Sequence, residues 1–368
     1  MEKIRSVLCW SKVCGVYWPS HLDTACRFER RVVFFGMPNT APSYSIVVET
    51  DNLLTNSWDE FGQLINQLGD QIIRATSLGH PERPEIIFVS NGPGEQAEEF
   101  LAEVKSRVPD IFDYGLPRSI NHPNGRYYQL KNTGARAANG EIIVFLDSDL
   151  ILDDQWLANL LSPFKDNSET IASLGCTFLS HNDWVSRTFA LIWIFPIKGG
   201  SERSISKRPI SVNNCAFQRE WFLKNFFPEN DGFKVDCALL FKTLQAQKAP
   251  ISRPAAYANH LPLRGWRFLL WRAAVTGRDA DRKYAILKYP TRGRRIYHAL
   301  SRNFTHLIKI PIKVISGHRK VNLPMWQIFP SILLGWGFYG FASATQLLRA
   351  FGMTSDSEER VPEWIQHS

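Results

Sequence analysis

Hydrophobic and polar positions along the chain follow two alternating spacings from residue 44 onward. Two short runs rich in Ile, Val and Phe, at 44–50 and 86–90, predict strands that are buried on both faces of a sheet. Between them, apolar side chains recur every three or four residues over 61–72, which is the spacing of an amphipathic helix. Ser57 and Glu60 precede this helix in the pattern of a capping box, in which each side chain accepts a hydrogen bond from the other residue's amide.

The alternation continues toward the middle of the chain. Helices are predicted over 96–108 and 130–139, with Gly140 as the C-terminal cap of the second, and another apolar strand follows over 141–146. Strands that alternate with helices through short loops predict a mainly parallel sheet with helices on both faces. Because ligands of such sheets bind beyond the carboxyl ends of the strands, we expect an α/β nucleotide-binding core with its site at that edge.

Changes in composition along the chain indicate where this core begins and ends. The core is expected over 43–263, after an N-terminal extension, 1–42, that shows neither spacing and has no assigned role. Three further segments follow it: a basic amphipathic segment, 264–320, an apolar membrane-associated segment, 321–349, and a polar tail, 350–368. No secretory signal is expected, because polar and charged residues interrupt the first apolar stretch.

The overall composition excludes several classes of protein. Of 368 residues, 44% are hydrophobic and 21% are charged, which is close to the globular average and excludes wholesale disorder, collagen and coiled coil. Six cysteines without a paired C-x-x-C exclude a structural zinc site and a small disulfide framework, so a reducing compartment is expected. The net charge is +8, and the segment 264–320 alone contains fifteen Lys or Arg against two Asp. This segment therefore needs an anionic partner such as lipid, phosphate or nucleic acid.

Two carboxylates follow the predicted strand over 141–146. Asp147 and Asp149 lie one residue apart, where ligands of an α/β sheet bind. Hard oxygen donors at this spacing suit Mg²⁺ or Mn²⁺ bridging a diphosphate. The alternative is a polar strand end that leads into a helix cap, since such tripeptides are common. The surrounding sequence favours the metal site.

The residues around this pair carry a resemblance to a known family. The run over 131–149 contains an Asn-x-Gly turn, an Ala-rich helix, an Ala-x-Gly-Glu step and a hydrophobic strand that ends in D-x-D. It resembles the central block of family 2 glycosyltransferases, which have the GT-A fold. Three more blocks are similar and stand in the same order, at 45–52, 213–220 and 236–242, so the resemblance covers about residues 44–245. It implies a nucleotide-diphospho-sugar transferase fold, with a mixed, mainly parallel sheet between helices.

The resemblance also implies an inverting, metal-dependent transfer of a sugar from a nucleotide-diphosphate donor to a hydroxyl acceptor. Asp147 and Asp149 would hold Mg²⁺ or Mn²⁺, Asp149 most directly, and His260 is a candidate third ligand. Asp236 would be the general base that removes the acceptor proton. The residues expected on the donor side are Thr50, Asn52, Ser90, Asn91, Lys131, Asn132 and Asp147, and those on the acceptor side are Asn213 and Asn214.

Two departures from the family pattern leave parts of this interpretation open. Ser90 and Asn91 stand where the family commonly has paired Asp, so the identity of the nucleotide is open. Val235 replaces the usual Glu, and its effects on the pKa of Asp236 oppose each other, because lost repulsion lowers that pKa and desolvation raises it. Asp236 is alternatively a helix-start carboxylate that complements the helix dipole, and His260 is alternatively a buried structural histidine.

The C-terminal third predicts attachment to a membrane. Arg residues interleaved with Trp, Phe and Leu over 264–282 fit a basic amphipathic helix, and 284–315 is a second candidate for a helix on the membrane surface. The stretch over 321–348 has no charged residue in 28 positions, and about 20 apolar residues suffice to span a bilayer. Its prolines and glycines leave three alternatives: a spanning helix, an interfacial hairpin or a buried core segment. Nucleic acid, which also suits Arg and aromatic side chains, is not expected as a partner.

These features together predict an enzyme on the cytoplasmic face of a membrane. Its partners would be a nucleotide-diphosphate sugar and a membrane lipid or lipid-linked acceptor, in the assembly of a polysaccharide or its precursor. The apolar run over 189–197 is too short to span a membrane and is expected to cover the active site or to line an acceptor groove. Two other functions stay open: a sugar nucleotidyltransferase, and a non-catalytic membrane-bound sugar-binding protein.

Overall fold

The computed structural model of the chain describes residues 43–54, 57–92, 97–198, 210–229, 232–262, 265–288 and 290–353. All of these residues belong to one compact unit, residues 39–368. The predicted N-terminal extension, 1–42, and the predicted polar tail from residue 354 onward lie outside the described residues.

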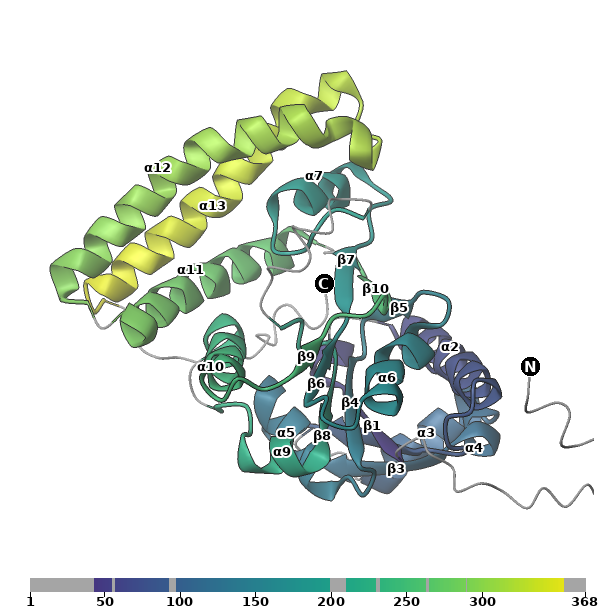
Figure 1. The fold of residues 1–368 in the computed structure, drawn as a ribbon. Coiled ribbons are helices and arrows are strands. Elements are labelled where there is room, and N and C mark those ends of the chain that lie inside the picture. Colours follow the sequence, from purple (N-terminus) through teal and green to yellow (C-terminus); the bar gives the residue numbers. More distant parts are fainter. Residues whose placement is uncertain are drawn as a thin grey trace, which may run out of the picture. The chain divides into compact units, whose positions relative to one another are not determined.

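Two sheets organise this unit (Figure 1). The larger sheet has seven strands in the order β3-β2-β1-β4-β8-β6-β9. They are β1 (Tyr44–Glu49), β2 (Glu85–Ser90), β3 (Leu116–Asn121), β4 (Ile142–Asp147), β6 (Ala172–Leu174), β8 (Asn214–Gln218) and β9 (Ile251–Ser252). β8 is antiparallel to β4 and β6, and the other neighbours are parallel, so the predicted mixed α/β sheet is confirmed. The smaller sheet has the order β5-β10-β7 and consists of β5 (Leu150–Leu152), β7 (Cys176–Leu179) and β10 (Tyr257–His260).

Helices cover both faces of the larger sheet because successive strand residues point to opposite faces. Ile46 and Val48 of β1 pack in one core, whereas Val47 between them packs in the other. The first core is closed by α2 (Trp58–Ser77), α3 (Ala97–Arg107), α4 (Ile111–Tyr114) and α6 (Trp156–Asp166). The second is closed by α5 (Tyr127–Ala137), α9 (Arg219–Lys224) and α10 (Phe233–Ala246). Two further helices, η2 (Asp51–Leu54) and α7 (Trp184–Ile192), follow strands β1 and β7.

The capping box predicted at the start of α2 is present. Ser57 Oγ accepts from the Glu60 amide at 3.2 Å, and the Glu60 carboxylate accepts from the Ser57 amide at 3.3 Å. The pair satisfies amides that the first helical turn leaves without partners, which fixes where α2 begins.

The predicted end of the helix before β4 is wrong. α5 begins at Tyr127, and its C-cap is Ala138, so Gly140 does not cap this helix. A Cβ on Gly140 would lie 2.4 Å from the Tyr44 carbonyl carbon and 2.5 Å from the Ser45 amide nitrogen. Glycine is therefore needed at this position because the loop passes directly against β1.

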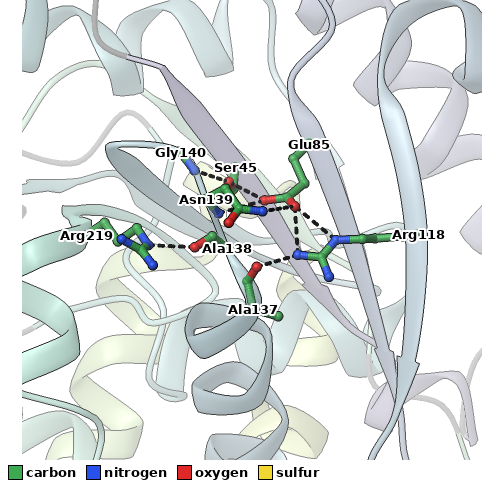
Figure 2. Close-up of polar contacts among 8 residues, drawn as sticks. All are labelled: Ser45, Glu85, Arg118, Ala137, Ala138, Asn139, Gly140 and Arg219. Carbon is green, nitrogen blue, oxygen red and sulfur yellow. Dashed lines mark hydrogen bonds and ion pairs between the residues drawn. The ribbon is translucent and has the colours of Figure 1, made fainter.

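A polar network around Glu85 holds the edge of the sheet where β1 and β2 begin (Figure 2). One carboxylate oxygen of Glu85 accepts from Ser45 Oγ at 2.7 Å and from the Asn139 amide at 2.9 Å. The other oxygen accepts from Arg118 Nε at 2.9 Å and from Asn139 Nδ2 at 3.0 Å. Ser45 Oγ in turn accepts from the Gly140 amide at 2.8 Å. The Ala-x-Gly-Glu step of the motif therefore ties β1, β2 and β3 to the end of α5, at the edge opposite the predicted site.

We expect Glu85→Gln to destabilise the fold at neutral pH by about 2 kcal/mol, because hydrogen bonds to a charged group each contribute about 1.5–3 kcal/mol. Burial raises the pKa of Glu85, but the hydrogen bonds from Ser45 and Asn139 and the charge of Arg118 outweigh burial and lower it. A carboxyl with a depressed folded-state pKa stabilises above its unfolded-state pKa, and this contribution is lost as the pH falls through the folded-state pKa.

Urea unfolding at neutral pH and at about pH 3 measures this effect. The difference between Glu85→Gln and wild type should be large at neutral pH and should shrink in acid. Glu82→Gln, which changes an exposed residue on the loop just before β2, is the matched control and should follow wild type at both pH values. An equal difference at both pH values would mean that the charge of Glu85 does not stabilise this edge.

The C-terminal third folds into three long helices, α11 (Trp266–Lys288), α12 (Arg292–Gly317) and α13 (Ile328–Ala350), with η3 (His318–Val321) and η4 (Met325–Gln327) between the last two. α13 packs against both α11 and α12 (Figure 1). Its approach to α11 is close, since a Cβ on Gly277 would lie 1.9 Å from the Ala342 carbonyl oxygen. In the described part of the chain, none of the helices has the length and hydropathy needed to cross a membrane.

The helix predicted over 264–282 to lie on a membrane surface is present as α11, but packing buries much of it. Trp266 and Leu270 are exposed, whereas Trp271 and Val275 are buried. α11 packs against α10 and α13, so most of its aromatic and apolar side chains contact protein. The spacing of apolar residues predicts which face of a helix is covered, but it does not distinguish protein from lipid as the cover.

Candidate active site

A cavity of about 400 Å³ lies at the carboxyl ends of β1 and β4, bounded by α10 and α11. On its acidic side, strands and strand ends contribute Asp51, Asp147, Asp149 and His260. On its basic side, α10 and α11 contribute Lys234, Arg272, Asp279 and Lys283. Aromatic side chains line the walls between them, namely Trp193, Phe195, Phe233, Phe268 and Trp271. The predicted edge of the sheet therefore carries a cavity with two sides of opposite charge.

Asp147, the last residue of β4, is buried and bonded to two residues of α5. Its Oδ1 lies 2.5 Å from Lys131 Nζ and 3.0 Å from the Tyr127 hydroxyl, and its Oδ2 accepts from the same hydroxyl at 2.8 Å. Glu49 lies opposite Asp147 in the register of β1 and β4 and is fully buried. Burial and the charge of Asp147 raise the pKa of Glu49 well above its usual range, against the opposing effect of Lys131. Burial beside Asp147 therefore disfavours the charged form of Glu49, and Lys131 balances the charge of Asp147.

Pairing between β5 and β10 brings His260 to Asp149. His260 lies opposite Leu150 in the antiparallel register, and the Leu261 amide donates to the Asp149 carbonyl at 2.9 Å. His260 Nε2 lies 3.0 Å from Asp149 Oδ2, and His260 Nδ1 lies 2.7 Å from the Leu261 carbonyl oxygen. Burial lowers the pKa of His260, but the charge of Asp149 and these hydrogen bonds outweigh burial and raise it. Asp149 Oδ1 is buried and has no hydrogen-bond partner among the described residues.

Asp149 and His260 together fit a Mg²⁺ or Mn²⁺ ion. The Leu261 carbonyl holds a proton on His260 Nδ1, which leaves Nε2, beside the Asp149 carboxylate, as the nitrogen that can bind a metal. Asp149 Oδ1 is a hard oxygen donor without an internal partner. The other carboxylate predicted to bind the metal, Asp147, lines the cavity but is bonded to α5. The described residues contain no group of three His, Cys, Asp or Glu placed around an ion. Two protein ligands are enough for Mg²⁺, which completes its shell with phosphate oxygens and water.

Three residues predicted on the donor side lie close to the cavity without lining it. Thr50 Oγ1 donates to a carbonyl of β2 at 3.0 Å, which ties the ends of β1 and β2 together. Asn91 Nδ2 donates to Asp51 Oδ1 at 2.6 Å, and Ser90 Oγ is buried without a hydrogen-bond partner in the described part of the chain. A fourth, Asn52, lies in η2, and its side chain is outside what the structure describes. Donor binding by these residues stays a prediction.

Lys131 and Asn132 were also predicted on the donor side, but contacts inside the protein hold both side chains away from the cavity. Lys131 is fully buried against Asp147. Asn132 Nδ2 donates to the Phe227 carbonyl and to Glu229 Oε1, both at 2.8 Å, and its Oδ1 accepts from the Phe227 amide at 3.2 Å. Asn132 therefore orders the segment before α10, and Lys131 holds Asp147, so both contribute to the site indirectly.

The two asparagines predicted on the acceptor side have different surroundings. Asn213 lines the cavity, and its Oδ1 accepts from Thr177 Oγ1 at 3.0 Å. Asn214 is fully buried in β8, where its Oδ1 accepts from Trp156 Nε1 at 2.8 Å, so its side chain serves the fold. The apolar run over 189–197 also reaches the site, since the residues that follow α7 from Trp193 onward line the cavity.

Asp236, the predicted general base, lies in the first turn of α10 and is buried. Its Oδ2 accepts from the Gly232 amide at 3.3 Å, so the carboxylate complements the start of its own helix. Lys234 and Cys237 line the cavity on either side of Asp236, but Asp236 is not among the lining residues. Its role as the base stays a prediction.

Sequence reasoning missed three residues of the acidic side. Glu49 is a charged residue at the end of an otherwise apolar strand, and Asp51 follows that strand directly, so both carried a signal in the sequence. Tyr127 carried none, because its contact with Asp147 depends on where α5 begins.

Comparison with known proteins finds a family model that matches the central region. Residues 53–226 match the family model described as Glycosyl transferase family 2. No curated protein sequence matches the chain. The mannosyltransferase PcManGT from Pyrobaculum calidifontis, in complex with GDP-Man and Mn²⁺, is similar at 15% identity with a TM-score of 0.47, over 84% of this chain and 87% of that one.

GalNAc-T7 with UDP, GalNAc and Mn²⁺ is similar at 15% identity with a TM-score of 0.44, over 67% of this chain. This chain spans about half, 51%, of that protein's chain. The family model covers Asp147, Asp149 and Asn213, whereas Asp236 and His260 lie beyond it. Residues 53–226 therefore match the model of the family that the motifs resemble, glycosyl transferase family 2.

Proposed function

We propose that the chain is a metal-dependent, inverting glycosyltransferase with the GT-A fold, which moves a sugar from a nucleotide-diphosphate donor to an acceptor hydroxyl. The observation that supports this most is the pair Asp149 and His260, with an unpartnered, buried carboxylate oxygen at the carboxyl edge of the sheet. A buried oxygen without a partner costs stability, and a bound cation would offset that cost. The family of residues 53–226 supports the reaction class.

The residues on the acidic side of the cavity have different roles in binding the donor. Asp149 and His260 would hold a Mg²⁺ or Mn²⁺ ion, which would supply positive charge against the negative charge that builds on the leaving diphosphate. Asp147 keeps its position through Lys131 and needs no movement when the donor enters. Asp51 lines the cavity, and its carboxylate suits the hydroxyl groups of the donor ribose.

The acceptor enters from the side of α10 and α11. Its hydroxyl oxygen forms the new bond to the anomeric carbon, and the bond from that carbon to the diphosphate oxygen breaks on the opposite face. Asp236 takes the acceptor proton, a role supported by its place in the motif at the start of α10. Asn213 contributes an amide that suits the hydroxyl groups of a sugar.

We also propose that α12 attaches the enzyme to the cytoplasmic face of a membrane, where a lipid-linked acceptor is available. α12 has an exposed apolar stripe at helical spacing, consisting of Tyr297, Leu300, Phe304, Ile308, Ile312 and Ile315. Its opposite face packs into the protein through Ala299, Ile310 and Val314. Exposed cations accompany the stripe, namely Arg292, Arg294, Lys309, Lys313, Arg319 and Lys320. An exposed apolar patch beside cations suits an anionic lipid surface.

We expect Ile312→Glu to weaken binding to vesicles of phosphatidylcholine and phosphatidylglycerol at least about tenfold. Burial of an isoleucine side chain is favourable by about 1.5–3 kcal/mol, and 1.4 kcal/mol corresponds to a factor of ten. Ile73→Glu, which changes an exposed isoleucine of α2, is the matched control and should bind like wild type. Cosedimentation measures the effect. If wild-type protein stays in the supernatant, or if both variants bind equally, α12 is not the attachment surface.

Donor binding is tested by the melting temperature of the purified protein with UDP or GDP, each with and without Mn²⁺. A ligand at 100 times its dissociation constant stabilises the folded state by about 2.7 kcal/mol. We expect a rise for one of the nucleotides, and only when Mn²⁺ is present. If neither nucleotide with Mn²⁺ raises the melting temperature, the proposed donor class is wrong.

A further inference from the structure

Four residues that line the cavity carry a buried polar atom without a hydrogen-bond partner. One is Asp149, whose Oδ1 suits the metal. The others are the indole nitrogens of Trp193 and Trp271 and the Oδ1 atom of Asp279, none of which has a partner in the part of the chain that the structure describes. Buried donors and acceptors are nearly always paired in native proteins, so unpaired ones on the wall of a cavity point to a ligand.

α11 positions two of these groups. Trp271 and Asp279 lie about two turns apart, on the face of α11 that lines the cavity. Phe233 of α10 packs beside Trp271, and the amide of the next residue, Lys234, donates to Asp279 Oδ2 at 2.8 Å. This hydrogen bond fixes the orientation of the carboxylate, so Asp279 Oδ1 has a set position for a ligand.

Trp193 places the third group beside the metal pair. It is the C-cap residue of α7, and its amide donates to the Phe189 carbonyl at 2.8 Å, which fixes the backbone at this point. Its ring lies 6.2 Å from the His260 ring and 5.2 Å from the Phe195 ring, centroid to centroid. The three unpartnered groups therefore extend from the metal pair to α11, on the side from which the proposed acceptor enters.

A ligand that pairs all three groups must offer acceptors to the two indole N–H groups and a donor to the carboxylate oxygen. A hydroxyl group does both, because its oxygen accepts and its proton can be donated. An ionised phosphate or carboxylate only accepts, so it would leave Asp279 Oδ1 unpaired. Phe268 and Val275 pack with Trp271 and add apolar surface that suits the C–H groups of a sugar ring. A sugar therefore fits this wall better than an anion does.

We propose that Trp193, Trp271 and Asp279 bind the hydroxyl groups of a sugar that the acceptor carries. This rests on the proposed function, in which the metal pair receives the donor diphosphate and the acceptor enters beside α11. Trp271 and Asp279 lie beyond residues 53–226, so the family model does not describe this part of the cavity. The acceptor class is then a sugar or a glycolipid, in which an existing sugar provides the hydroxyl group that is glycosylated.

The test is isothermal titration with the octyl β-glycosides of glucose, galactose and mannose, each below its micelle-forming concentration. Tetraethylene glycol monooctyl ether carries the same apolar chain without a sugar and is the reference ligand. Wild-type protein should bind at least one glycoside at least about tenfold more tightly than the ether, because the sugar presents hydroxyl groups to several buried atoms, one of them charged.

Two substitutions remove the polar atom and keep most of the side chain. Asp279→Asn retains an oxygen for the Lys234 amide and puts an NH₂ donor in place of the unpartnered acceptor, so it should weaken glycoside binding at least about tenfold. Trp271→Phe retains an aromatic ring without the N–H group and should weaken it about fivefold. Both variants should keep their affinity for the nucleoside diphosphate with Mn²⁺, since the metal pair is intact.

Trp221→Phe is the matched control for the loss of an indole N–H group. Trp221 Nε1 donates to Gln247 Oε1 at 2.7 Å, and Trp221 is not among the residues that line the cavity. This variant loses a hydrogen bond of the fold and should bind the glycoside like wild type. Glycoside affinity therefore separates a binding role of an indole group from a structural one.

The outcomes distinguish this subsite from the proposed donor site. If no glycoside binds more tightly than the ether, or if Asp279→Asn binds the glycoside like wild type, the sugar subsite is overturned. It is also overturned if the variants lose the nucleoside diphosphate and keep the glycoside, since these atoms would then serve the donor. If the glycoside binds as expected while no nucleoside diphosphate binds, the sugar subsite stands and the proposed donor fails.

Discussion

Asp149→Ala should abolish metal-dependent binding of the nucleoside diphosphate. Asp149 offers the unpartnered carboxylate oxygen of the site, and without it His260 is the remaining side chain of the pair. Loss of residues that merely orient a metal ligand costs about 10–100-fold in affinity or activity, so loss of the ligand itself should cost more than about 100-fold. Titration of UDP or GDP in the presence of Mn²⁺ measures it.

Asp154→Ala is the matched control for this change. Asp154 lies five positions further along the chain, and its carboxylate is exposed in a surface ion pair with Arg74. Surface ion pairs contribute about 0–1 kcal/mol, so this variant should bind the nucleotide with Mn²⁺ like wild type. A folded Asp149→Ala protein that still binds the nucleotide better with Mn²⁺ than without it would place the metal elsewhere.

Asp236→Asn should leave donor binding nearly intact and reduce transfer by about 10²–10⁴-fold, which is the usual contribution of a general base. Asparagine keeps an oxygen that can accept from the Gly232 amide, so the start of α10 should be preserved. Nucleotide binding by the same variant is the internal control, and initial rates with a saturating acceptor measure the loss. Near-normal turnover would show that Asp236 only caps its helix.

Asp279→Asn tests whether Asp279, and not Asp236, is the general base. Asp279 lines the cavity, whereas Asp236 does not. If Asp279→Asn loses turnover as a base would while Asp236→Asn keeps it, the proton acceptor lies on α11 and the motif was carried over to the wrong carboxylate.

The positions of the central strands could be predicted because these strands are buried on both faces of the sheet. β1, β2 and β4 are continuous apolar runs, and each was predicted within two residues of its observed bounds. β3 was missed because it is the edge strand of the larger sheet, carries polar side chains and contains Pro117, which only an edge accommodates readily. Its pairing with β2 is a tertiary contact that local spacing does not reveal.

The site residues that directly follow a predicted strand could be predicted from the sequence. Asp147 and Asp149 were found in this way, and strand pairing then brought His260 to Asp149. The basic side was not found, because the cations of α11 were interpreted as a membrane surface. Which face of α11 meets the cavity depends on its packing against α10 and α13, and one sequence gives no sign of that choice.

The most direct test of the central claim is the product formed from a nucleotide-diphosphate sugar by the purified protein with Mn²⁺ and an acceptor. The proposed function predicts release of a nucleoside diphosphate that requires Mn²⁺, is lost in Asp149→Ala, and accompanies a glycoside of inverted anomeric configuration. Production of pyrophosphate would indicate a nucleotidyltransferase instead. Binding of the sugar nucleotide without any release would indicate a sugar-binding protein, and either result would contradict glycosyl transfer.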